Sequence, residues 1–232
     1  MTAHIPSAAP EFGAARATAR PTSLTEWSVR ELRTLLAEGA YPPGSRLSEE
    51  ELCTRLQVSR NTLREALRIL THERLLIHEH NRGVYVRRPS AEELADLYRV
   101  RRLIEPSAIR EFDGTPSRLN RVVAAVAEGE AARGADGRAL GTANVHFHLA
   151  VTALAGSARA DELVLRVLTE LRLVFHVMPD LDDFHRRFLV RNREILALLE
   201  RGPQAKPDAA EALTRYLHDA EAELLSRYRS LP

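Results

Sequence analysis

The sequence predicts a mostly α-helical protein with one short β-hairpin in its first half. Three observations point to this class. Aromatic residues make up only 5% of the chain while aliphatic residues are plentiful, apolar residues recur at helical spacing over most of the length, and strand patterns occur only near residues 75–86. The 232 residues suffice for one large or two small domains with a stable core.

The first element of regular structure is expected after a long irregular start. Residues 1–22 are rich in Ala, Pro, Thr and Ser and have almost no periodic apolar pattern, so we expect a disordered arm. A helical pattern then runs from Leu24 to Leu36. It stops at the stretch EGAYPPGSRL, where two prolines and two glycines force a turn.

Two short helices joined by a tight turn are expected next. Ser48 and Glu51 form a capping box for the first, and Ser59 is the N-cap of the second, which runs from Arg60 to about His72. In the stretch VSRNTLREAL, the second helix begins with long hydrogen-bonding side chains where a helix that only packs would carry acids. This is the layout of a helix-turn-helix that lies against DNA.

The stretch LLIHEHNRGVYVRR predicts a β-hairpin after these helices. Residues 75–78 and 84–86 alternate as strands, and residues 81–83 form the turn between them. The hairpin is therefore a wing with Arg82 at its tip. Pro89 and Ser90 follow as a hinge.

The rest of the chain predicts an all-helical bundle. Its breaks fall at DGTPS, RGADG, AGS, MPDLD and RGPQAKP. The expected helices are 91–113, 116–133, 138–154, 158–177, 182–201 and 207–229. The sequence therefore predicts a disordered arm (1–22), a winged helix-turn-helix domain (23–88) and a helical domain (89–232).

Composition constrains the cellular setting more than the function. The net charge is +1, and residues 23–88 carry eleven Arg against nine Glu, so DNA binding must depend on where the arginines lie. Cys53 is the only cysteine, which favours a reducing cytoplasm. The start lacks the pattern of a secretory signal, and the longest uncharged run, residues 139–158, contains His and Asn, so we expect no membrane association.

These residues resemble a known family. The segments PPGSRLSEEELCTRLQVSRNTLREALRIL and NRGVYV resemble the winged helix-turn-helix of the GntR superfamily of bacterial transcription regulators. The segments LYRVRRLIEPSA, NVHFHLAV, RNREI and RYLHDAEAELL resemble the FCD effector domain of its FadR-like branch. Together the two resemblances cover all but the N-terminal arm.

The resemblance implies a mode of DNA reading, in which the second helix enters the major groove and the wing tip approaches the minor groove. By position, the expected contacts are Arg60, Asn61, Thr62 and Arg64 on the helix and Arg82 and Gly83 on the wing. Side-chain chemistry agrees, since Arg suits guanine and phosphate and Asn suits adenine, while Ser59 at the helix N-terminus can receive a phosphate. The chain departs from the family at Glu50, often an arginine, and at Gln57, commonly glycine.

The resemblance also implies a metal site, which this chain carries in altered form. FCD domains often bind a divalent metal through an Asp and three His, and the matching positions here are Asn144, His148, Asn192 and His218. Neutral amides are weak ligands, so no cofactor is certain, and a divalent ion such as zinc or nickel is expected to bind weakly at most. It would be held by His148 and His218, with Asn144, Asn192 or His185. The alternatives are a polar pocket that binds an effector directly and histidines that only hydrogen-bond in the core.

Arg101 is the strongest candidate for recognising an effector. The family uses the corresponding arginine to pair with a ligand carboxylate, whereas the alternative is an ion pair with Glu105 on the helix surface. Arg172 is a further candidate. The predicted effector-binding residues are Arg101, Asn144, His148, His185, Asn192 and His218.

The sequence thus predicts a homodimeric cytoplasmic transcription regulator and no enzymatic activity or catalytic residues. We expect a repressor that binds a double-stranded DNA operator of twofold symmetry and is released when a small carboxylate tilts or loosens the winged domains about Pro89. Two alternatives remain open at this stage. One is a metal-dependent hydrolase built on the helical domain, and the other is a DNA-binding protein that responds to no ligand.

Overall fold

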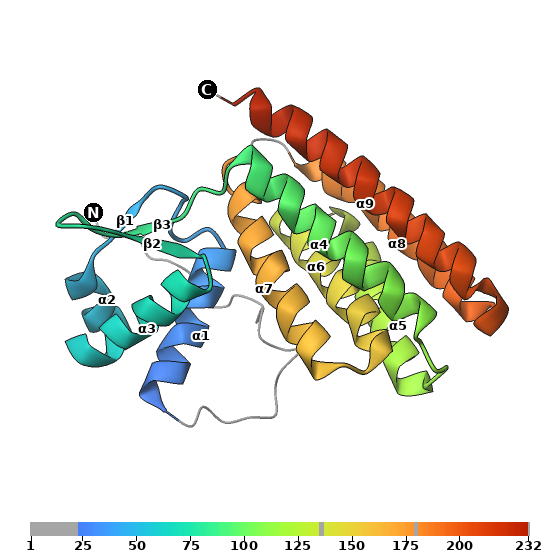
Figure 1. Ribbon diagram of the computed structural model, residues 1–232, viewed down its shortest axis with the longest axis horizontal. Helices are drawn as coiled ribbons and strands as arrows, with labels where there is room; N and C mark the ends of the chain where they lie inside the picture. The colour runs from blue at the N-terminus through green and yellow to red at the C-terminus, as the bar shows by residue number, and fades with distance from the viewer. Residues whose placement is uncertain (1–22, 135–136, 179–180, 232) are drawn as a thin grey trace.

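The computed structural model describes residues 23–134, 137–178 and 181–231, and the expected arm at residues 1–22 lies outside them. A small N-terminal lobe of helices and strands lies beside a larger helical bundle (Figure 1). The described chain is mostly helical with one small antiparallel sheet, which confirms the predicted fold class. The lobe contains α1 (Leu24–Ala37), β1 (Arg46–Leu47), α2 (Glu49–Leu56), α3 (Arg60–His72), β2 (Leu76–Glu79) and β3 (Gly83–Val86).

Serine side chains set the start of each helix in the N-terminal lobe. Ser23, Ser48 and Ser59 each accept a hydrogen bond from the backbone N–H three residues further on. Gln57 ends α2 in the left-handed region, with φ 53° and ψ 43°. This backbone is costly for a residue with a Cβ, and it makes the tight turn from α2 into α3.

The sheet has the strand order β1-β3-β2, and both pairings with β3 are antiparallel. Its register places Leu47 opposite Val84 and Leu76 opposite Val86, and all four side chains are buried against the helices. The sequence predicted the hairpin of β2 and β3. It did not predict β1, because two residues are too few to show an alternating pattern.

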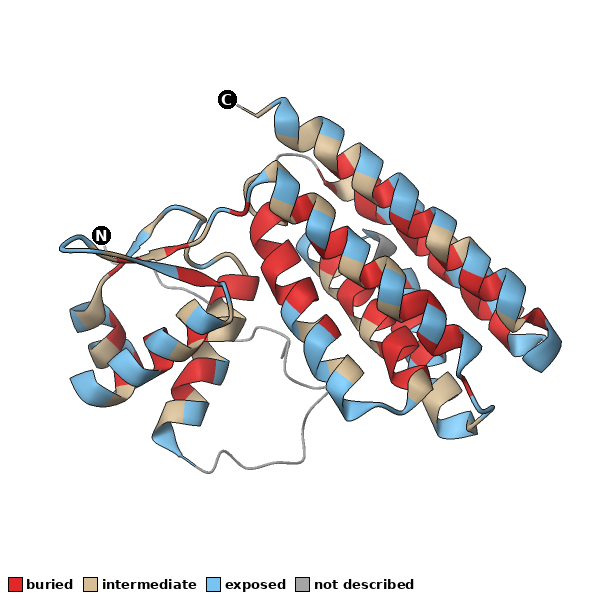
Figure 2. Cartoon of the chain, viewed as in Figure 1, coloured by how far each residue is buried: buried red, intermediate tan, exposed pale blue. Residues whose placement is uncertain are grey.

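The helical bundle follows the predicted segments closely. Its members are α4 (Ala91–Arg110), α5 (Pro116–Ala131), η2 (Ala132–Gly134), α6 (Gly137–Thr152), η3 (Ala153–Ala155), α7 (Ala158–Phe175), α8 (Asp182–Glu200), η4 (Pro203–Ala205) and α9 (Lys206–Arg229). Ser90 and Glu93 start α4 with a complete capping box. Helices α4, α5, α8 and α9 each turn a buried face towards the bundle and an exposed face outward, whereas α6 is buried over most of its length (Figure 2).

The two lobes have separate hydrophobic cores that meet at α7. One core is built from α4 to α9, and the other from α1, α2, α3 and the sheet. Leu173 of α7 is fully buried in the second core, although most apolar residues of α7 belong to the first. Helix α7 is therefore shared between the lobes.

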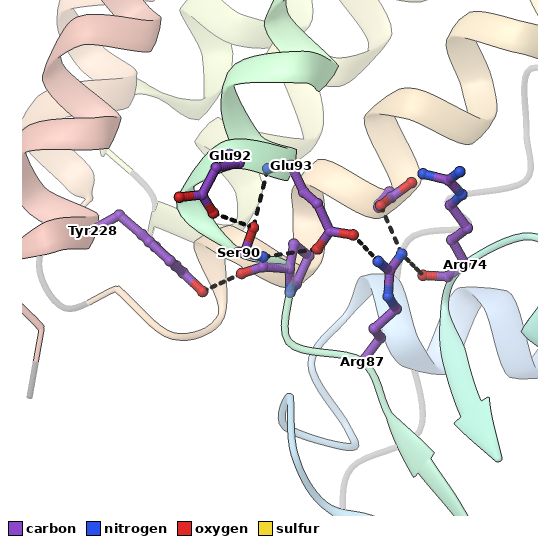
Figure 3. A network of polar contacts seen from close by, with 8 residues as sticks. Arg74, Arg87, Ser90, Glu92, Glu93 and Tyr228 are labelled. Atoms are coloured by element: carbon purple, nitrogen blue, oxygen red, sulfur yellow. Dashed lines mark hydrogen bonds and ion pairs between the residues drawn. The ribbon is translucent and has the colours of Figure 1, made fainter. Parts of the chain in front are cut away.

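The linker between β3 and α4 is braced by polar contacts. Arg87 pairs with Glu93 and donates to the Arg74 carbonyl at 3.4 Å and to Glu170 of α7 at 3.1 Å (Figure 3). The Tyr228 hydroxyl of α9 donates to the Pro89 carbonyl. The predicted hinge is thus held from both lobes. In the ranges that the structure describes, no helix combines the length and the apolar character needed to cross a bilayer.

Candidate DNA interface and effector pocket

The N-terminus of α3 is exposed to solvent, and no acidic side chain in its first turn offsets the helix dipole. Ser59 Oγ lies 3.1 Å from the Thr62 backbone nitrogen and 2.9 Å from Thr62 Oγ1, so both side chains brace the first turn. Arg60, Asn61 and Arg64 point to solvent. All of α3 is described, and its first turn contains no acidic residue, whereas the first turn of α2 contains three. The positive end of the α3 dipole is therefore free to face phosphate.

Arg64 is held in place by Glu49 of the preceding helix. Arg64 Nε lies 2.9 Å from Glu49 Oε2, and the Arg64 side chain is still 64% exposed. An exposed pair of this kind contributes only about 0–1 kcal/mol. Little free energy is therefore needed to release Arg64 from Glu49 for another anionic partner.

The wing tip presents a further exposed basic group. Arg82 is exposed and makes a long 3.4 Å contact with Glu79. Gly83 has φ +110°, which only glycine adopts readily, and a Cβ there would lie 3.2 Å from Arg46 Nε of β1. The sequence gives no sign that Arg46 lies near the wing, because this proximity depends on strand β1, which was not predicted.

A chain of buried polar side chains crosses the interior of the bundle. Arg101 Nε donates to Glu105 Oε1 at 2.7 Å on α4, and Glu105 Oε2 lies 2.6 Å from His148 Nδ1 of α6. His148 Nε2 is 3.1 Å from the hydroxyl of Tyr216 on α9. The arrangement joins three helices through charged and polar groups that are almost fully excluded from solvent.

Two amides extend this chain to α8. The Tyr216 hydroxyl donates to Asn144 Oδ1 at 2.9 Å, and Asn192 Nδ2 donates to the same oxygen at 2.9 Å. We call the six residues Arg101, Glu105, Asn144, His148, Asn192 and Tyr216 the polar cluster. Among the described residues, Arg101 Nη2 and Asn192 Oδ1 are buried without a hydrogen-bond partner. Each of these two atoms therefore keeps an unused capacity for a hydrogen bond.

Charge in the polar cluster is internally balanced. Burial alone would raise the pKa of Glu105, but the Arg101 charge and the hydrogen bonds from Arg101 and His148 hold it below its usual value. Burial lowers the pKa of His148, and the nearby Arg101 charge lowers it further. The cluster therefore contains an Arg101–Glu105 ion pair next to a neutral imidazole.

Comparison with known proteins decides the family. The family model described as "Bacterial regulatory proteins, gntR family" matches residues 26–86, and the FCD domain model matches residues 96–219. The chain belongs to the GntR family, in the branch that carries an FCD domain. It is therefore a DNA-binding transcription regulator, as the resemblance implied.

Solved GntR structures share this fold. A GntR transcriptional regulator from Rhodococcus sp. RHA1 is 44% identical, with a TM-score of 0.82 over 88% of this chain and 99% of that one. E. coli McbR/YncC is 21% identical, with a TM-score of 0.76 over 89% of this chain and 99% of that one, and shows the fold alone.

Curated relatives match this chain over part of its length. The Nta operon transcriptional regulator of Aminobacter aminovorans is 46% identical over 70 residues, or 30% of this chain and 33% of that protein. The HTH-type regulator BphR of Paraburkholderia xenovorans is 37% identical over 89 residues, or 38% of this chain and 36% of that protein. The alignments thus span about a third of each relative. Both curated relatives are named as transcriptional regulators, which fits a role other than catalysis.

The match to the FCD metal site was wrong at one position, His218. His218 is exposed on α9, so it does not join His148, and Tyr216 occupies the interior position instead. Successive residues of a helix point about 100° apart. His218, two residues after Tyr216, therefore points away from the buried stripe that contains Leu213, Leu217 and Leu224. An aromatic residue with a polar tip, on that stripe, was the signal in the sequence that was missed.

Arg101 forms the ion pair that was one of the two alternatives left open by the sequence. It does pair with Glu105, four residues further on, but the pair is buried and not on the surface. Its Nη2 is left without a partner among the described residues. The family role in ligand binding and the ion pair are therefore compatible in this FCD domain.

His185 lies in the interior but in a different place from that expected. It is buried beside Phe175 and Phe184, and its Nε2 would be 3.0 Å from a Cβ added to Gly141 of α6. Burial lowers the pKa of His185 to about 4, with a further contribution from Arg172. Over the described ranges, no group of three or more His, Cys, Asp or Glu side chains is placed to hold a metal ion. Weak metal binding remains a prediction.

Proposed function

We propose that this GntR regulator is a homodimeric repressor that leaves a twofold-symmetric operator when a small organic acid binds at the polar cluster. The α3 residues Ser59, Arg60, Asn61, Thr62 and Arg64 contact the major groove, and Arg82 and Gly83 approach the minor groove. Dimerisation through the FCD domains sets the spacing of the two operator half-sites.

The observation that carries the DNA part is the open N-terminus of α3. Its first turn contains no acid to offset the helix dipole, Arg60 and Asn61 are exposed, and Arg64 is held only by an exposed pair with Glu49. The wing adds Arg82 at the end of a rigid hairpin whose glycine cannot be replaced without strain.

The observation that carries the effector part is the pair of open buried groups in the polar cluster. Arg101 Nη2 can donate to a ligand carboxylate, and Asn192 Oδ1 can accept from a hydroxyl or amine on the same ligand. Arg101 carries a single positive charge, and Glu105 already pairs with it. The ligand is therefore a small hydroxy or amino acid and not a multiply charged anion.

A thermal-shift screen of small hydroxy, amino and unsubstituted carboxylic acids tests the effector part. We expect a hydroxy or amino acid to raise the melting temperature of the wild type and to weaken its binding to operator DNA selected from a random-sequence pool. Asn192→Leu should selectively reduce the shift given by the hydroxy or amino acid. A DNA affinity that no acid changes would identify a ligand-independent DNA-binding protein.

Analytical ultracentrifugation tests the oligomeric state. We expect a dimer at micromolar concentration with or without DNA. A monomer that dimerises only on the operator would move the dimer contact away from the FCD domain. Esterase and phosphodiesterase assays with added zinc cover the hydrolase alternative, and turnover abolished by His148→Ala would favour it.

A further inference from the structure

The C-terminal end of α1 is capped by side chains from the FCD domain. The last carbonyls of a helix have no partner within the helix, and cations near them are stabilising. Helix α1 lies entirely within the described residues and carries no basic residue in its last turn. The Ala37 carbonyl instead accepts from Arg172 Nε of α7 at 3.2 Å and lies 2.8 Å from His176 Nε2.

This contact is tightly packed as well as polar. Gly39 follows the helix with φ +74°, and a Cβ there would lie only 2.7 Å from His176 Nδ1. Leu173, between the two capping residues on α7, is buried in the core of the winged domain. One face of α7 thus contacts the C-terminal end of α1 through both polar and apolar groups.

Arg172 also reaches α6 on its other side. Its Nη2 donates to Thr142 Oγ1 at 3.4 Å, and its Nη1 would lie 2.5 Å from a Cβ added to Gly141. Gly141 and Thr142 come one turn or less before Asn144, on the helix that also carries His148 of the polar cluster. One guanidinium thus contacts both the winged domain and the helix that lines the proposed effector pocket.

We propose that Arg172 is the positioning residue that couples the polar cluster to the DNA-binding domain. A shift of α6 on ligand binding moves Gly141 and Thr142 against the guanidinium, which withdraws Nε from the Ala37 carbonyl. Because α1 packs directly on α3, loss of this cap loosens the orientation of the recognition helix. The coupling rests on the proposed function, since the effector is taken to act at the polar cluster.

A double-mutant cycle tests the coupling without any effector. Gly141→Ala places a methyl group against Arg172 Nη1 and mimics the displacement. We expect it to weaken binding to the selected operator by about fivefold or more, the lower end of allosteric couplings. In an Arg172→Met background, the same change should alter the operator dissociation constant by less than about twofold, because the link is already broken. Arg172→Lys, which keeps the charge but cannot span both contacts, serves if Arg172→Met does not fold.

Amide hydrogen exchange gives a readout that does not depend on DNA. The Gly39 and Ala40 amides donate to Leu36 and Leu35 carbonyls at the end of α1, so their exchange reports fraying of the cap. We expect Gly141→Ala to speed this exchange. The matched control is Gly129→Ala on α5, whose Cβ would meet Leu189 Cδ2 at 2.7 Å and should leave exchange at residues 39 and 40 unchanged.

The outcomes separate the coupling from the proposed function. Equal effects of Gly141→Ala in both backgrounds, or the same change in exchange with Gly129→Ala, would overturn the coupling even if an organic acid binds. If no acid binds, the effector proposal fails, while the cycle still decides whether Arg172 links α6 to the winged domain.

Discussion

His148 Nδ1 lies 2.6 Å from Glu105 Oε2, and both side chains are almost completely buried between α4 and α6. The same carboxylate accepts from Arg101 through its other oxygen. One glutamate therefore holds an arginine from its own helix and a histidine from another.

The first prediction concerns the stability of the buried pair. Glu105→Ala leaves the Arg101 charge buried without compensation, and we expect the free energy of unfolding to fall by about 3–5 kcal/mol. Combining Glu105→Leu with Arg101→Met should recover most of the loss. Urea denaturation measures both. The control is Glu211→Ala, which breaks an exposed pair with Arg215 and should change stability by about 1 kcal/mol or less.

The second prediction concerns DNA. Arg60→Ala and Arg64→Ala should each weaken binding to the selected operator by about 1–3 kcal/mol while leaving the circular dichroism spectrum unchanged. Arg215→Ala removes one positive charge on α9 and should leave binding nearly as it was. Wild-type affinity in both α3 variants, measured by fluorescence anisotropy, would show that α3 does not read the DNA.

The third prediction concerns pH. Burial lowers the pKa of His185 from 6.5 to about 4. Between pH 6.5 and pH 4, His185 is therefore protonated in the unfolded chain but mostly neutral in the folded chain. The contribution of His185 to stability is complete above pH 6.5 and declines as the pH falls towards 4, by up to about 1.4 kcal/mol per pH unit.

His185→Leu should therefore flatten the dependence of the free energy of unfolding on pH between 6.5 and 4. Some dependence stays, because burial also lowers the pKa values of His148 and His176. Urea denaturation at several pH values measures the slope. His78→Gln changes an exposed histidine and should leave the slope as in the wild type, and an unchanged slope in His185→Leu would contradict the assigned burial.

The fourth prediction concerns metal. Asn144, Asn192 and Tyr216 supply two neutral amides and a hydroxyl around His148, so the purified protein should hold little zinc or nickel after brief chelation. Because these side chains already lie within hydrogen-bonding distance of one another, Asn144→Asp with Asn192→His and Tyr216→His should bind one equivalent tightly. Elemental analysis decides. If the wild type keeps one metal ion per chain through dialysis against a chelator, the prediction of weak binding is wrong.

The sequence by itself was enough to predict the winged domain and the order of its helices. Ser48 and Ser59 cap their helices through hydrogen bonds three residues along the chain, and Gln57 adopts the left-handed turn expected where glycine is common. Such signals are local, so they can be found without knowing what the helix packs against.

Only the tertiary structure decided which side chains meet inside the FCD domain. A helical pattern shows which stripe of α9 is buried, but a choice between Tyr216 and His218 requires the phase of α9 against α6 and α8. The contact of Arg172 with the Ala37 carbonyl joins residues 135 positions apart, and α1 has no local signal for a cap that another helix supplies. Local hydrogen bonds and periodicity determine the elements. The packing of one helix on another determines which of their polar groups share a site.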